Sequence, residues 1–222
     1  LFEGSVQEYD PQGRIVVNNQ GLPVGATDRA IYGNAQYKYI TGANTSISYK
    51  GLTLSATIDI RQGGLMYSRT AEMMYFTGNT PQTTLNDREP FIIPNSVIKI
   101  DDGNGNISYV ENDVPIVGSA QNMNLYFNQT YGGGKFERAF MFDKSFVKLR
   151  DVVLSYRLPA KFISKIKLAN AEISLIGRNL LLWTPRENTF VDPELTTFGN
   201  DIAADYGEYG ATPTTRSFTA SL

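Results

Sequence analysis

The sequence predicts an all-β chain of antiparallel strands, and three observations support this fold class. Among its 222 residues are 13 Tyr, 12 Phe and 20 Gly, a composition typical of strands joined by polar loops. Several stretches alternate apolar and polar side chains with the two-residue period of a half-buried strand. The connections between these stretches are short at one end and long at the other.

The clearest strand is 52–61, LTLSATIDIR, in which every second residue is apolar. Residues 37–50 alternate in the same way, with aromatic, β-branched and small side chains on one face. Lys50 and Gly51 separate the two stretches, and so short a link containing glycine predicts a tight hairpin.

Three further strands are expected in the second half of the chain. The first, 146–158, alternates clearly toward its end and is stopped by Pro159. The second, 170–184, begins with the same period, but the alternation is broken near Gly177. The last is 214–222, TTRSFTASL. The whole chain therefore predicts five strands of about 9 to 13 residues.

The lengths of the connections indicate a membrane protein. The short connections are 50–51 and 159–169, and the long ones are 1–36, 62–144 and 185–212. Short turns at one end, long loops at the other and strands of about 10 residues with aromatic ends are typical of a transmembrane β-barrel. Inside the middle loop we expect helical turns in RTAEMMYF and a hairpin turning through the sequence GNG.

Composition excludes several classes of function. The chain has neither cysteine nor histidine, which excludes disulfides, thiol nucleophiles, histidine-based triads and zinc sites with sulfur or imidazole ligands. With 20 basic and 22 acidic residues and no basic run, it has no footprint for nucleic acid. No spacing of carboxylates identifies a catalytic pair, so we do not expect an enzyme.

An ordered set of motifs carries a family resemblance. The sequence FVKLRDVVLSYRLP spans 146–159, GRNL spans 177–180, DPE spans 192–194 and PTTRSF spans 213–218. This order resembles the C-terminal end of the SusC/RagA-type TonB-dependent transporters of Bacteroidetes. The upstream loop and hairpin also look like that family, so the resemblance covers nearly the whole chain. The family usually closes with a few more residues ending in an aromatic, whereas this sequence stops at Leu222.

The resemblance implies that residues 1–222 supply about the last five strands of a 22-strand outer-membrane barrel with long extracellular loops. The plug and the earlier strands would lie outside this chain. Such a barrel imports oligosaccharides or peptides together with a SusD-like surface lipoprotein, and TonB, ExbB and ExbD energise it through the plug. The family also implies that the two short turns face the periplasm and the three long loops face outward.

Alternation alone nominates side chains for the hydrated interior of such a barrel. The lumen-facing candidates are Thr53, Ser55, Thr57, Asp59, Arg61, Ser155, Arg157, Glu172 and Ser174.

Aromatic residues in the long loops are candidates for stacking on a ligand or contacting a partner, and the alternative is that they pack the loops. These candidates are Tyr75, Phe76, Tyr126, Tyr131, Tyr206 and Tyr209.

The acidic loop 187–208 offers Asp201 and Asp205 as weak candidates for Ca²⁺, against a solvated surface loop or a partner contact. The sequence DGNGN, residues 102–106, has the start of a calcium loop, but Ile107 stands where such a loop needs glycine. We therefore expect a plain hairpin turn there, and no cofactor is otherwise expected.

Two other folds fit the same alternation. A secreted soluble β-sandwich that binds carbohydrate would turn its apolar faces inward against each other. A complete small barrel of about eight strands could also be built from a chain of this length.

Overall fold

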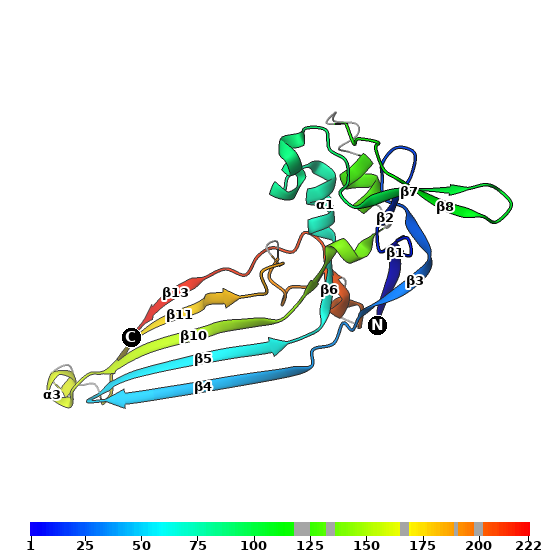
Figure 1. Ribbon diagram of the computed structural model, residues 1–222. Coiled ribbons are helices and arrows are strands. Elements are labelled where there is room, and N and C mark those ends of the chain that lie inside the picture. Colours follow the sequence, from blue (N-terminus) through cyan, green and yellow to red (C-terminus); the bar gives the residue numbers. More distant parts are fainter. Residues whose placement is uncertain (118–124, 132–135, 165–168, 189–190, 198–201) are drawn as a thin grey trace. The chain divides into compact units, whose positions relative to one another are not determined.

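The computed structural model describes residues 1–117, 125–131, 136–164, 169–188, 191–197 and 202–222 (Figure 1). The chain divides into two compact units. The sheet unit comprises 36–66, 142–197 and 211–222, and the loop unit comprises 1–35, 67–141 and 198–210. Among the described residues, none of the helices combines the length and the apolarity that a bilayer crossing requires.

The sheet unit is built on one antiparallel sheet of five strands, in the order β13-β11-β10-β5-β4 (Figure 1). The five predicted strands are confirmed, with ends within a few residues of those expected. The described strands form no closed barrel, because β4 and β13 are open edges, and the number of 22 strands stays a prediction. The bounds are Tyr39–Tyr49 for β4, Leu52–Gln62 for β5, Phe146–Arg157 for β10, Glu172–Trp183 for β11 and Ser217–Ser221 for β13.

Tight turns join these strands at one end. Lys50 and Gly51 have φ values of 48° and 86°, the two positive values that a two-residue hairpin turn requires. The predicted hairpin is therefore confirmed. The backbone N–H of Arg157 donates to the carbonyl of Gly51 over 2.8 Å, which ties this turn to the end of β10. Beyond Pro159 the helical turn α3, Ala160–Ile163, begins the second connection.

A bulge explains the broken alternation near Gly177. Leu149 of β10 lies opposite Leu181, but Asp151 lies opposite Arg178, so β11 carries one more residue than β10 between these pairs. Asn179 adopts a φ of 51° within this bulge. The irregular sequence thus marks a local change of register rather than the end of a strand.

One face of the sheet is apolar and open. Leu154 lies between Leu54 and Leu175 in the register, and Tyr156 and Leu154 each keep 38% of their surface exposed. Within the described residues no second sheet packs on this face, as the β-sandwich alternative would require. The face carries Tyr49, Ile47, Thr45, Ala43, Leu52, Leu54, Ala56, Ile58, Ile60, Val147, Leu149, Val152, Leu154, Tyr156, Ile173, Leu175, Leu181, Trp183, Phe218 and Ala220.

The opposite face carries the charged side chains of the strands. Its alternate positions along β5, β10 and β11 hold polar residues for most of their length. The charged residues on this polar face are Asp59, Arg61, Lys148, Arg150, Asp151, Arg157, Glu172 and Arg178.

The loop unit contains short strands inside the predicted long connections. β1, Phe2–Gln7, pairs antiparallel with β3, Gly25–Gly33. β2, Ile15–Val17, pairs parallel with β7, Ser96–Asp101, and β7 forms a hairpin with β8, Ile107–Glu111. The long connection predicted at 1–36 therefore contains β1 and β3, which the sequence did not reveal because the two strands pair irregularly and show no clean two-residue period.

Two local predictions in the middle loop are confirmed. The helical turns are α1, Arg69–Thr77, which Ser68 caps by accepting a hydrogen bond from the N–H of Ala71. The DGNGN segment is the β7–β8 hairpin turn, in which Asp102 Oδ1 accepts the N–H groups of Asn104 and Asn106.

The remaining elements of the long loops are short. They are β6, Leu65–Ser68; η1, Pro81–Arg88; η2, Leu125–Tyr131; η3, Glu137–Phe140; β9, Met141–Asp143; η5, Ile202–Tyr206; and β12, Gly207–Glu208. The core of the loop unit is formed by Val17, Leu22, Ile93, Ile116, Tyr126 and Phe127.

Candidate functional site on the polar face

Three segments bring opposite charges together on the polar face of the sheet. Asp59 and Arg61 come from β5, and Lys148 lies opposite Asp59 in the register of β10. The segment after β11 supplies Asp192 and Glu194. Because residues two apart on a strand share a face, these side chains meet on one side of the sheet. All of them belong to the sheet unit.

A bulge in β10 lies beside a further cation of this cluster. Leu149 pairs with Ile58, whereas Asp151 pairs with Thr57, so Arg150 is an extra residue between two register pairs. Its guanidinium bonds to Asp59 and therefore lies on the polar face. Strict alternation would have sent Arg150 and Asp151 to opposite faces. Alternation from Lys148 already puts Arg150 on the polar side, and the bulge turns Asp151 to that side as well.

Lys148 and Arg150 bind the acidic segment 192–194 to the polar face of the sheet. Lys148 Nζ lies 2.8 Å from Asp192 Oδ2 and 2.6 Å from Glu194 Oε2, and the Lys148 side chain is 1% exposed. Arg150 Nη1 donates to Glu194 Oε2 over 2.7 Å, and its Nη2 contacts both Glu194 and Asp59. A carboxylate bound in this way by both nitrogens of a guanidinium has a fixed orientation.

The same segment is tied to the entry of the last strand. Asp192 Oδ2 also accepts a hydrogen bond of 2.6 Å from the hydroxyl of Thr214. Asp192 Oδ1 accepts the backbone N–H of Glu194 over 3.1 Å, which fixes the local turn. We call the set Asp59, Arg61, Lys148, Arg150, Asp192 and Glu194 the charge cluster. It joins β5, β10 and the connection from β11 to β13.

The charges of the cluster balance, and its environment shifts the acidity of Glu194. Burial acts to raise the pKa of Glu194, but the hydrogen bonds from Arg150 and Lys148 outweigh it and lower the pKa from 4.5 to about 2. Glu194 therefore stays ionised at any physiological pH. Glu194 is therefore suited to forming permanent ion pairs that hold its segment in place, and not to exchanging protons near pH 7.

Aromatic rings extend the cluster at the β4 end. Arg61 Cζ lies 5.6 Å from the ring centroid of Tyr37 and 5.3 Å from that of Phe146. Lys144 Nζ lies 4.3 Å from the Tyr37 ring. Rings at these distances stabilise cations on sites with restricted access to water.

The residues nominated from alternation all belong to the polar face. Asp59 and Arg61 lie in the charge cluster, whereas the others extend along the strands toward the tight turns. Ser48 and Thr53 form one hydroxyl pair across β4 and β5, at 2.9 Å. The others are Ser55, Thr57, Ser155, Arg157, Glu172 and Ser174. That this face lines a lumen stays a prediction.

Sequence reasoning missed four members of the cluster. Lys148 and Arg150 lie in the motif FVKLRD, and Asp192 and Glu194 lie in the motif DPE. Each motif contains two like charges at a spacing of two, and the charges of the two motifs are opposite. This pattern could have suggested that the motifs pair with each other, although about 40 residues separate them.

The aromatic candidates of the long loops divide into two groups. Tyr75 and Tyr126 pack internally, with ring centroids 5.2 Å from Phe140 and 5.3 Å from Phe91 respectively. These two rings therefore pack the loops, which is the alternative interpretation given above. The exposed candidates are Phe76, Tyr206 and Tyr209.

Two candidates cannot be placed, and the calcium hypothesis gains no support. The side chain of Tyr131 and all of Asp201 lie outside the described residues. Asp205 is exposed in the loop unit. Among the described residues, no group of three or more Asp or Glu side chains could hold a metal ion.

Comparison with known proteins identifies the relatives of this chain. No family model matches. The TonB-dependent receptor P26 of Formosa agariphila is 26% identical over 211 residues, which cover 92% of this chain and 18% of that receptor. The TonB-dependent receptor P3 of the same organism is 23% identical over 225 residues, covering 97% of this chain and 19% of that receptor. The chain is therefore similar to these two TonB-dependent receptors over nearly its whole length.

Solved structures agree with this relationship at the level of the fold. A structure of the RagAB peptide importer in the open-open state matches with a TM-score of 0.59 at 18% identity, over 99% of this chain and 21% of that one. The closed-closed state of the same importer gives a TM-score of 0.57 at 18% identity, over 99% of this chain and 22% of that one. The chain therefore spans about a fifth of the length of the proteins that it matches.

Proposed function

We propose that the chain is a five-strand wall segment of an outer-membrane importer of the SusC/RagA type, with residues 1–222 near the C-terminal end of its barrel. The apolar face of the sheet would contact lipid, and the polar face with its charge cluster would line a hydrated interior. The separation of the two faces is the observation that supports this proposal most directly.

The apolar face fits a bilayer better than it fits water. Leu175 is 55% exposed and Phe218 is 78% exposed, and both belong to a continuous surface that spans the five strands. Soluble proteins rarely leave so large an apolar surface uncovered. In a bilayer this exposure is favourable, because acyl chains replace water around these side chains.

The open edges require the rest of a barrel. Unpaired backbone groups cost several kcal/mol each in hydrocarbon, and β4 and β13 both present such groups. Further strands outside this chain would pair with both edges. This requirement agrees with the small share of the related receptors that the chain spans.

The transport role is proposed from the relatives. A TonB-dependent importer of this kind would take up oligosaccharides or peptides with a SusD-like lipoprotein, and TonB, ExbB and ExbD would act through a plug outside this chain. Support comes from the receptors with which the chain shares 23–26% identity and from the fold that it shares with a peptide importer. Under this proposal the protein is not an enzyme, and the long connections face outward.

Two adjacent positions on β10 can test which face contacts lipid. Leu154 lies on the apolar face and Ser155 lies on the polar face. We expect a fluorophore attached at Leu154→Cys in the cysteine-free full-length protein to be quenched by spin-labelled lipid acyl chains. The same fluorophore at Ser155→Cys should be quenched by a water-soluble agent instead.

The pair also tests the main alternative. Equal quenching by the water-soluble agent at both positions, in a protein that stays monodisperse without detergent, would contradict the proposal and favour a soluble carbohydrate-binding module. Since both substitutions lie on one strand one residue apart, they share the same depth along the sheet and act as matched controls.

A further inference from the structure

At the end of the sheet that carries the tight turns, a lysine side chain contacts a residue of the apolar face. Lys50 occupies the β4–β5 turn, and its Nζ lies 5.2 Å from the ring centroid of Tyr49. Tyr49 belongs to the apolar face and is 69% exposed. This cation–π contact holds the Lys50 ammonium beside the rim of the apolar face rather than over the polar face.

A row of apolar-face side chains continues from this point. Tyr49 lies opposite Leu52, and Leu52 lies opposite Tyr156 on β10, so two tyrosines flank one leucine at the end of the sheet. Both tyrosines are exposed. Tyrosine is favoured at a membrane interface, where its ring contacts acyl chains and its hydroxyl meets water.

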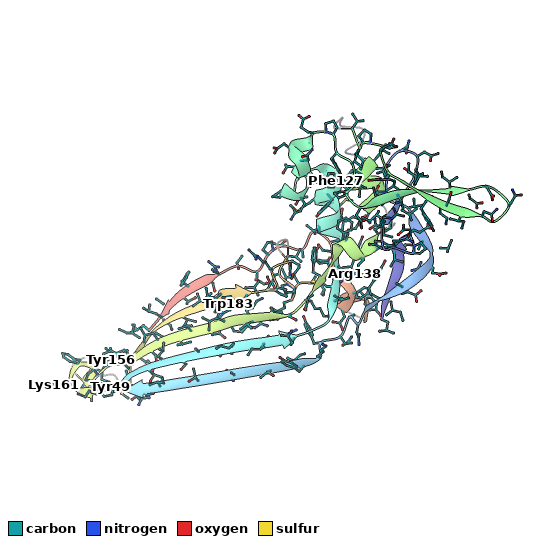
Figure 2. All side chains as sticks on the ribbon, viewed as in Figure 1. Tyr49, Phe127, Arg138, Tyr156, Lys161 and Trp183 are labelled. Atoms are coloured by element: carbon teal, nitrogen blue, oxygen red, sulfur yellow. The ribbon has the colours of Figure 1, made fainter. Side chains whose placement is uncertain are left out.

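A second exposed lysine lies at the same end. Lys161 belongs to α3, next to Phe162, which is 65% exposed. Figure 2 shows Lys161, Tyr49 and Tyr156 together at this end of the sheet. The hydrogen bond between Arg157 and Gly51 joins the two connections, so both lysines are carried by linked turns.

The charge at this end is not balanced by acids. Glu172 is the one acidic residue among the described residues at this end, which are 48–53, 155–164 and 169–174. It lies on the polar face, directly opposite Arg157 on the neighbouring strand. Among the described residues, neither Lys50 nor Lys161 forms an ion pair. The charge cluster on the polar face, by contrast, balances its cations with carboxylates.

We propose that Lys50 and Lys161, together with Tyr49, Tyr156 and Phe162, form a docking surface for the phosphate groups of anionic phospholipids. The inference rests on the proposed function, since it requires the apolar face to lie in a bilayer. The acyl chains would lie on that face, and the headgroup phosphate would meet the two ammonium groups at its rim. A lysine beside an anionic lipid surface contributes favourably to binding, and its flexible stem can reach the headgroup region.

The test measures the lipid that stays bound to the full-length protein. Nanodiscs would contain equal amounts of phosphatidylglycerol and phosphatidylcholine, and native mass spectrometry would give the ratio of the two lipids retained. We expect the unmodified protein to favour phosphatidylglycerol. In the Lys50→Gln, Lys161→Gln double variant, this preference should fall about 25-fold, since each lysine contributes roughly fivefold.

Two control variants separate a charge effect from a folding effect. Lys38→Gln changes an exposed lysine beyond the other end of β4 and should leave the lipid ratio unchanged. Lys50→Arg with Lys161→Arg keeps both charges and should retain the preference.

The two proposals fail differently. A double variant that inserts into nanodiscs normally and retains the unmodified lipid ratio would overturn the docking surface alone. Failure of the unmodified full-length protein to enter nanodiscs at all would overturn the proposed function, and the docking surface with it.

Discussion

At the scale of single residues, the most consequential side chain is Lys148. It is almost fully buried and bridges Asp192 and Glu194, and its loss would leave two carboxylates with fewer partners. Burying an uncompensated charge costs far more than an exposed ion pair contributes, because the surrounding protein solvates charge poorly.

We expect Lys148→Met to lower the free energy of unfolding of the full-length protein by about 3 to 5 kcal/mol. Lys99→Met is the control, because Lys99 pairs with Glu8 at the surface, where such a pair contributes about 1 kcal/mol or less. Adding Asp192→Asn to Lys148→Met should recover part of the loss. Denaturant titration in detergent measures all three, and equal effects of the two lysine substitutions would contradict the role of the cluster.

The acidity of Glu194 predicts how stability depends on pH. Its pKa is lowered on folding, from 4.5 to about 2, so its ionised form stabilises the fold above pH 4.5. As pH falls from about 4.5 to about 2, this contribution should disappear. The measurement is the difference in Tm between the unmodified full-length protein and Glu194→Gln. A difference that stays constant from pH 7 to pH 2 would show that the ion pairs of Glu194 do not stabilise the fold.

At the scale of elements, the β11 bulge shapes the apolar face. A Cβ atom on Gly177 would lie 2.9 Å from Cδ2 of Leu180, closer than real contacts allow, so Leu180 lies over this glycine. Gly177 and Leu180 therefore fit together as a pair, and a larger side chain at position 177 would have to displace the end of the Leu180 side chain.

We expect Gly177→Val to destabilise the full-length protein by about 1 to 3 kcal/mol through overpacking. Gly42→Val in β4 is the matched control, because a Cβ there meets nothing within 4 Å. Combining Gly177→Val with Leu180→Ala should cost less than the sum of the two single changes. Additive effects in this double-mutant cycle would indicate that the two side chains do not compete for the same space.

At the scale of the whole molecule, the sheet leaves two edges and one apolar face open among the described residues. β4 and β13 have unpaired edges, and the apolar face lacks a partner among the described residues. A polypeptide with two such edges and an uncovered apolar face tends to self-associate in water.

We therefore expect residues 1–222, expressed alone, to aggregate in aqueous buffer and to require detergent. The full-length protein in detergent should be monodisperse. Sedimentation velocity of both samples measures this, and a monodisperse, folded segment in buffer without detergent would argue for the soluble β-sandwich instead.

Local patterns in the sequence are enough to predict the five strands of the sheet and, outside the bulges, their two faces. Alternation at 52–61 and 146–158 places each side chain on one of two faces, because successive residues of a strand point in opposite directions. The turn at Lys50-Gly51 and the helical turns of α1 could also be predicted, since turn and cap chemistry act over a few residues. Lumen-facing candidates such as Thr53 and Ser55 follow from the same rule.

The pairing of the charges and the burial of the loop residues, by contrast, depend on contacts between segments far apart in the sequence. Asp192 and Glu194 reach Lys148 from more than 40 positions away in the sequence, and two-residue periodicity contains no information on such distant contacts. The bulge at Arg150 overrides alternation, because one extra residue reverses the side of the sheet that the next side chains face. Tyr126 shows the same limit, since its burial depends on Phe91 and Phe127 and not on its immediate neighbours alone.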